Sequence, residues 1–135
     1  MVKVAVPVTD GKVDCPPLGQ EIYIYDISDF AKLVEIYDNP AKTAKSVPGM
    51  IMLKSALDKD VSAFIVNEIH SPGVMFLKGN KFANDNIKIF LAENERLEDA
   101  IKKYVKKELK DITESGQKKM LLTAHDLGLF EYQNF

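Results

Sequence analysis

The chain has 135 residues, a formal net charge of −2, and 46% hydrophobic and 28% charged residues. This length and composition predict one globular domain that buries an ordinary core without disulfides or a structural metal. Only Arg96 among the 18 basic residues is an arginine, so the chain lacks the bidentate groups that usually read phosphate or guanine, and we expect no nucleic acid among its partners.

A single cysteine, Cys15, excludes an internal disulfide and a CxxC redox pair. That cysteine usage is typical of a reducing compartment. The apolar N-terminal run, residues 2–8, is too short for a signal peptide, and no apolar stretch approaches the roughly 20 residues of a membrane span. We therefore expect a cytoplasmic protein without a membrane partner.

The first third of the chain has the patterns of three strands. Residues 2–8 alternate around valines and end at a turn signal, which predicts a mostly buried strand. Residues 21–27 and 31–37 are rich in β-branched and aromatic side chains and are joined by Ser28-Asp29, which predicts an antiparallel hairpin. Asn39-Pro40 then ends the second strand of the hairpin.

The middle of the chain changes to alternating helices and strands. Ser46 as a cap and Pro48 in the first turn predict a helix. The apolar run 61–66 has the length of a strand, and a second short helix is predicted over residues 72–78.

A further strand is predicted over residues 86–91, and apolar residues at steps of three and four predict an amphipathic helix over residues 95–109. Strands that alternate with helices pair in parallel, so we predict one α/β domain, residues 1–110, with a mixed sheet flanked by helices. Residues 111–135 are predicted to be an extension that packs on this domain or on a partner. The partner option would include a homodimer, because exposed apolar patches usually mark contacts.

Two residues that could bind a metal follow strands of the predicted sheet. In open α/β sheets ligands bind beyond the carboxyl ends of the strands. Cys15 follows the first strand and His70 the fourth. If these strands are adjacent and parallel, a thiolate and an imidazole reach one crevice, a ligand pair that suits iron, copper, zinc or an iron–sulfur fragment.

Structural roles for the same residues stay open. Cys15 could pack as a small hydrophobe, and His70 could satisfy a loop carbonyl. Pro16-Pro17 would stiffen the loop in either case. His125 is interpreted as a solvated residue. Three methionines could be soft ligands but are more typical of core filler: Met50, Met52 and Met75.

Four stretches share a family pattern: KVAVPVTDGKVDCPPLGQEIYIYDI, EIYDNPAK, DVSAFIVNEIHSPGVMFLKGN and IKIFLAENERLEDAIKKY. Together they resemble the dinitrogenase iron-molybdenum cofactor family, small carriers and chaperones of the nitrogenase cofactor and its precursors. The resemblance covers residues 2–109 and implies a ribonuclease H-like fold. Relatives often carry Ser-Pro-His-Phe-Gly-Arg in the first loop, where this chain has CPPLGQ from Cys15 to Gln20. Many carry glycine after the fourth strand, where this chain has His70.

The resemblance implies a non-enzymatic carrier or chaperone for an iron–sulfur or iron–molybdenum-type cluster, bound transiently and exchanged with donor and acceptor proteins. We interpret Cys15 as a thiolate that replaces the family's imidazole, with His70 as the second ligand. Two alternatives stay open: a small interaction or regulatory module without metal, and a metal-dependent nuclease on a ribonuclease H-like fold. The single arginine and the scattered carboxylates disfavour the nuclease.

Overall fold

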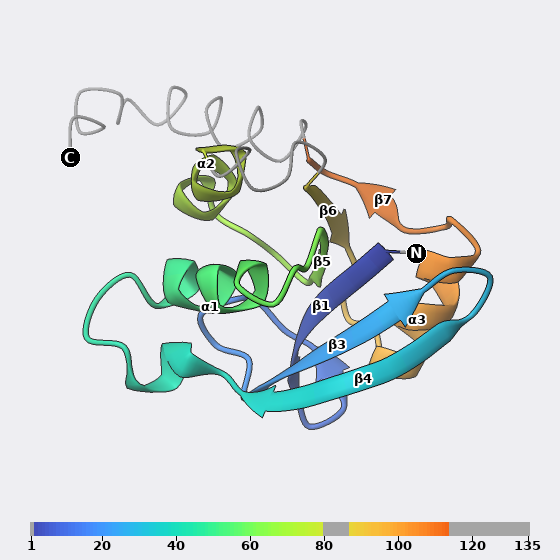
Figure 1. Cartoon of the computed structure of the whole chain (residues 1–135), viewed down its shortest axis with the longest axis horizontal. Helices are drawn as coiled ribbons and strands as arrows, with labels where there is room; N and C mark the ends of the chain where they lie inside the picture. Colours follow the sequence, from blue (N-terminus) through green and yellow to red (C-terminus); the bar gives the residue numbers. More distant parts are fainter. Residues whose placement is uncertain (1, 80–86, 114–135) are drawn as a thin grey trace.

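The computed structural model describes residues 2–79 and 87–113, which form one α/β unit (Figure 1). The elements are β1 (Val2–Thr9), β2 (Lys12–Val13), β3 (Glu21–Ile27), β4 (Ala31–Asp38), η1 (Pro40–Thr43), α1 (Pro48–Leu57), β5 (Ala63–Val66), α2 (Ser71–Gly79), β6 (Lys88–Leu91), α3 (Leu97–Val105) and β7 (Lys110–Asp111). The predicted order of strands and helices is confirmed.

The strands form one mixed sheet. Its order is β4-β3-β1-β5-β6-β7, with β2 paired to β1 alone. The β3–β4 hairpin is antiparallel, as predicted, whereas β1, β5 and β6 are parallel neighbours. The condition for bringing the two candidate ligands together is therefore met, because the first and fourth predicted strands, β1 and β5, lie side by side.

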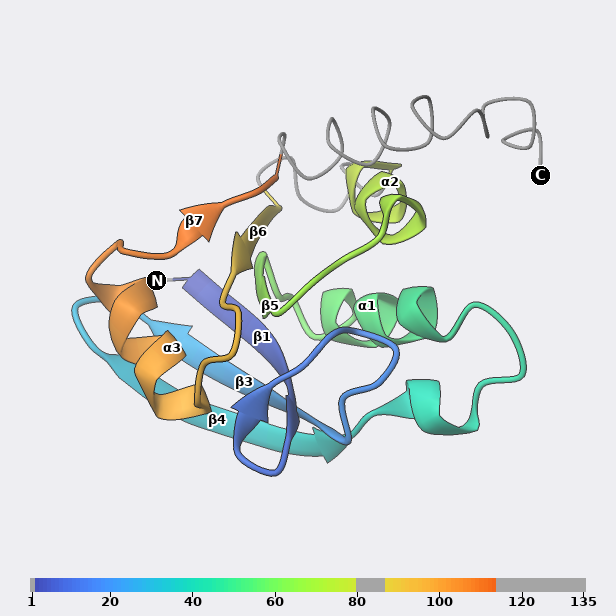
Figure 2. The ribbon, with the colours of Figure 1, turned by 180° about the vertical axis from the view of Figure 1, so that it is seen from behind.

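Helices cover both faces of the sheet (Figure 2). Alternate residues of each central strand point to opposite faces, so Ala5 and Phe64 pack under α1 and α2. Val4 and Ile65 pack under α3 on the other face. The alternating valines of β1 thus supply the half of the core under α3, and Ala5 between them faces the other half. No described helix has the length and apolar character needed to cross a membrane.

The element ends differ from the sequence predictions in physical detail. Ser46 does not cap α1; the N-cap is Val47, which has a left-handed backbone with φ 42° and makes no side-chain capping bond. Helix α3 is shorter than the predicted 95–109, and Lys107, two residues beyond its end, has φ 61°. The two-residue strands β2 and β7 were not predicted, because two residues show no periodicity.

Of the predicted C-terminal extension, residues 111–113 are among the described residues. Strand β7 includes Asp111 and pairs with β6. Residues 114–135, which include His125, lie outside the described residues. The division into 1–110 and 111–135 and the ribonuclease H-like label both stay predictions.

Candidate functional site

The segments that follow β1 and β5 meet beyond the carboxyl ends of these two central strands. The Asn67 N–H donates to the Asp14 carbonyl at 3.1 Å. This bond links the Cys15 loop, residues 14–20, to the residues that lead into α2. The loops of Cys15 and His70 therefore meet, as the sequence predicted.

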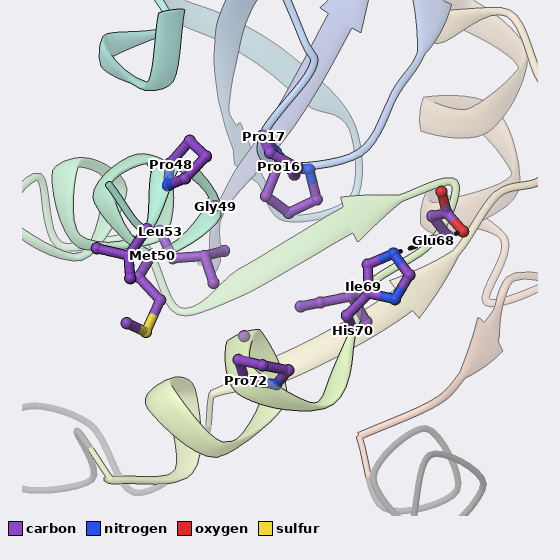
Figure 3. Close-up of a pocket in the computed structure, with 12 residues that line it drawn as sticks. Pro16, Pro17, Pro48, Gly49, Met50, Leu53, Glu68, Ile69, His70 and Pro72 are labelled. Carbon is purple, nitrogen blue, oxygen red and sulfur yellow. Dashed lines mark ion pairs between the residues drawn. The ribbon is translucent and has the colours of Figure 1, made fainter. Parts of the chain in front are cut away.

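A cavity of about 320 Å³ opens beside this junction (Figure 3). It lies between the Cys15 loop, the first turn of α1 and the start of α2. The lining residues are Pro16, Pro17, Val47, Pro48, Gly49, Met50, Leu53, Glu68, Ile69, His70, Pro72 and Gly73. Apolar side chains make up most of this wall, and Glu68 and His70 are the two residues on it with ionisable groups.

His70 is exposed at the rim of this cavity. Its side chain is 63% accessible, and Nε2 lies 3.9 Å from the Glu68 carboxylate (Figure 3). Its backbone carbonyl accepts hydrogen bonds from the N–H groups of Gly73 and Val74, which lie in the first turn of α2. Among the described residues no loop carbonyl accepts a bond from the imidazole, so the ring is open to a ligand.

Cys15 lies in the adjacent loop but is buried, with 4% exposure. Burial raises the pKa of its thiol to about 11, and the nearby carboxylates of Asp14 and Glu68 add to the rise. Cys15 therefore carries its proton at neutral pH. Of the described residues that line the cavity, Pro16 is its immediate neighbour, but Cys15 itself is not among them. The structure brings the two loops together and exposes only His70.

Two helix N-termini lie beside the cavity. The wall includes Pro48, the first residue of α1, and Pro72 and Gly73 from the first turn of α2. A helix N-terminus carries partial positive charge from N–H groups without intrahelical partners, which favours an anionic ligand. The Glu68 carboxylate opposes this effect at the rim, where its side chain is 61% exposed.

The three methionines named as possible soft ligands differ in burial and position. Met52 is fully buried and fills the core, as the sequence favoured, while Met75 is 55% exposed. Met50 lies on the cavity wall with its thioether extended along it (Figure 3).

The protein supplies few metal ligands in this region. No group of three or more histidine, cysteine, aspartate or glutamate side chains converges within residues 2–79 and 87–113. A bare metal ion that needs several protein ligands does not match this ligand set. A cluster that brings its own sulfides needs fewer.

Sequence reasoning missed Asn39, which was interpreted only as the end of a strand. Asn39 is 1% exposed. Its carboxamide nitrogen donates to the carbonyls of Pro16 and Gly19 at 2.9 and 2.8 Å, and its oxygen accepts from the Ala41 N–H at 2.9 Å. An asparagine before a proline is a recognisable cap signal, but its bonds to a loop about 20 residues away left no signal in the sequence.

Comparison with known proteins places the chain in a family. The model of the dinitrogenase iron-molybdenum cofactor family matches residues 1–107. A search of curated proteins finds no match.

Solved structures share the fold. The first is an NMR structure of a candidate NifB protein from Thermotoga, with TM-score 0.64, 22% identity and coverage of 84% of this chain and 95% of that one. The second is a crystal structure of a candidate dinitrogenase from Methanocaldococcus jannaschii, with TM-score 0.54, 21% identity and coverage of 82% and 93%. The third is the apo orange protein of Desulfovibrio gigas, with TM-score 0.63, 15% identity and coverage of 82% and 92%.

Proposed function

The chain belongs to the dinitrogenase iron-molybdenum cofactor family, and we propose that it is a non-enzymatic carrier of an iron–sulfur or iron–molybdenum-type cluster. The cluster is cargo, bound in the cavity between the Cys15 loop, α1 and α2 and then passed to an acceptor protein. The observation that carries this proposal is the exposed His70 imidazole on a cavity where two helices begin.

The wall of the cavity supports cargo of this kind. The soft, polarisable sulfides of a metal–sulfide cluster can pack against prolines and the Met50 thioether, and the negative charge of the cluster is favoured at helix N-termini. Few protein ligands are an advantage for a carrier, because each additional metal–ligand bond slows release. A donor and an acceptor protein are the partners that this role requires. A lone cysteine agrees with a reducing compartment, for which we propose the cytoplasm.

His70 and Cys15 have different parts in this proposal. His70 can bind the cluster without a change in conformation, because its ring is exposed. Cys15 is the second ligand, and it must lose its proton and turn toward the cavity before it can bind. A bound metal favours that deprotonation, since thiolate rather than thiol is the metal ligand.

Anaerobic reconstitution with iron, molybdate and sulfide tests the proposal. We expect the wild type to retain cluster iron and sulfide after gel filtration, with charge-transfer absorption in the visible range. His70→Ala and Cys15→Ala should each lose most of the bound iron. Because His70 is exposed and alanine is tolerated at buried cysteine positions, both variants should keep the wild-type circular dichroism spectrum.

His125→Ala is the matched control for His70→Ala, since it removes the chain's other histidine. It should retain iron like the wild type. Equal iron loss in both histidine variants would point to nonspecific binding, and a folded wild type that retains no iron would reject the carrier function.

A further inference from the structure

Asn39 is a buried polar residue that does not line the cavity. It is hydrogen-bonded to the Cys15 loop, which forms one wall of the cavity. Its carboxamide reaches from the end of β4 to the Cys15 loop and donates to the carbonyls of Pro16 and Gly19. The backbone makes a third link, because the Asn39 N–H donates to the Gln20 carbonyl at 3.1 Å. One residue therefore ties three positions of the loop to the rigid hairpin.

Inside the loop the hydrogen bonds close around Cys15. The Cys15 carbonyl accepts from the N–H groups of Leu18 and Gly19 at 3.3 and 3.0 Å, and the Asp14 carboxylate accepts from the Cys15 N–H at 2.7 Å. These bonds fix the local turn. They leave the Pro16 and Gly19 carbonyls to be satisfied from outside, and Asn39 satisfies both.

Apart from these bonds, the loop has a close contact with β1. A Cβ on Gly19 would lie 2.7 Å from the Pro7 Cβ, so the backbone of the loop rests directly on the strand. Leu18, at the tip, is 69% exposed and adds little packing. At the two ends of the loop, the Asp14 and Gln20 N–H groups donate to the Pro7 and Val8 carbonyls at 2.8 and 2.9 Å. Between these ends, Asn39 holds the loop through the carbonyls of Pro16 and Gly19.

We infer that Asn39 is the positioning residue of the cargo site: its carboxamide keeps the Cys15 loop closed over the thiol, and release of its bonds to Pro16 and Gly19 opens Cys15 to the cavity. This inference takes its functional meaning from the proposed carrier role. The carrier then has a closed state with a protected thiol and an open state in which Cys15 joins His70 as a ligand. Loss of Asn39 shifts the balance toward the open state.

Alkylation of Cys15 by iodoacetamide in the metal-free protein tests this inference. Asn39→Ser is the informative variant, because serine still caps η1 through the Ala41 N–H but is too short to reach the loop. Two buried acceptors lose their donor, so we expect alkylation at pH 8 to become about tenfold faster or more than in the wild type.

The control variant is Ile101→Ala, which removes buried packing from α3 on the opposite face of the sheet. Alkylation rates of the two variants are compared at urea concentrations that give equal global stability. A faster rate in Asn39→Ser at equal stability supports local opening. Equal rates would overturn the inference, since they would mean that Cys15 reacts only after global unfolding.

The wild type gives a second measurement that needs no variant. The dependence of its alkylation rate on low urea concentrations should be much weaker than that of global unfolding, because local opening exposes little surface. A slope equal to that of global unfolding would contradict the inference. Neither result depends on cluster binding, so failure of the carrier function in reconstitution is a separate outcome. If both hold, Asn39→Ser should also take up and release iron faster than the wild type.

Discussion

The backbone N–H of Asn67 donates to the Asp14 carbonyl and so ties the residue after β5 to the residue after β2, where the Cys15 loop begins. This link brings the Glu68 carboxylate toward the Cys15 loop. Burial is the main cause of the raised pKa of Cys15, and Asp14 and Glu68 both add to it. The thiol therefore lies near two carboxylates, which oppose its ionisation.

This environment predicts a loss of stability at alkaline pH. The pKa of Cys15 is about 11 in the folded chain and has an ordinary value of 9.0. The unfolded chain thus releases the proton at lower pH than the folded chain, so the free energy of unfolding should fall as pH rises from 9 to 11 and level off above that range. Urea unfolding of the wild type and Cys15→Ala at each pH measures this contribution as a difference. A constant difference across the range would contradict the assignment.

Metal binding to the same thiol should release a proton. With a pKa of about 11, Cys15 is protonated at pH 8, so a metal must displace one proton. We expect the apparent affinity for Cd²⁺ to rise about tenfold per pH unit between pH 8 and 9.5. Thiolate-to-metal absorption in the ultraviolet reports the binding. Cys15→Ser should lack this absorption, and an affinity in the wild type that does not change with pH would exclude Cys15 as a ligand.

Two glycines beside the cavity should respond oppositely to alanine. A Cβ on Gly19 would lie 2.7 Å from the Pro7 Cβ and 3.2 Å from backbone atoms of β1, whereas a Cβ on Gly49 would be 3.5 Å from Pro17. Gly19→Ala should therefore destabilise the fold by about 1–3 kcal/mol. Gly49 lies in α1, so Gly49→Ala should stabilise the fold by up to about 1 kcal/mol, because alanine has the higher helix propensity. Thermal unfolding compares the two variants, and equal shifts would contradict the contact at Gly19.

Much of the fold could be predicted because its signals are local. The valine alternation of β1 indicated a buried strand, and the apolar steps around Ile101 indicated α3. Parallel pairing of β1, β5 and β6 followed from the rule that strands alternating with helices pair in parallel, but the sequence left open which strands are neighbours. The sequence therefore made the meeting of the Cys15 and His70 loops conditional on β1 and β5 being neighbours, and the structure meets that condition.

The state of each site residue could not be predicted in the same way. Cys15 and His70 both lie in loops that follow strands, but one is buried and the other exposed, because burial depends on contacts between distant segments. The role of Asn39 depends on carbonyls of Pro16 and Gly19, which any residue type would offer. Ser46 is a residue type that often caps helices, yet Val47 is the N-cap of α1, directly before Pro48 at the first helical position.

Val47 gives the last prediction, because its backbone is strained at the cavity wall. A β-branched residue at φ 42° is unfavourable by about 1–2 kcal/mol, and Val47 is 51% exposed, so its side chain contributes little packing. Val47→Gly should therefore stabilise the fold by about 0.5–1 kcal/mol. Val34 in β4 is 41% exposed and has no positive φ, so Val34→Gly is the matched control and should destabilise the fold. Urea unfolding of both variants decides the point, since destabilisation by Val47→Gly would show that the strain is absent. If Val47→Gly is more stable but retains less iron after reconstitution, the strained backbone holds the start of α1 in the geometry that the cargo requires.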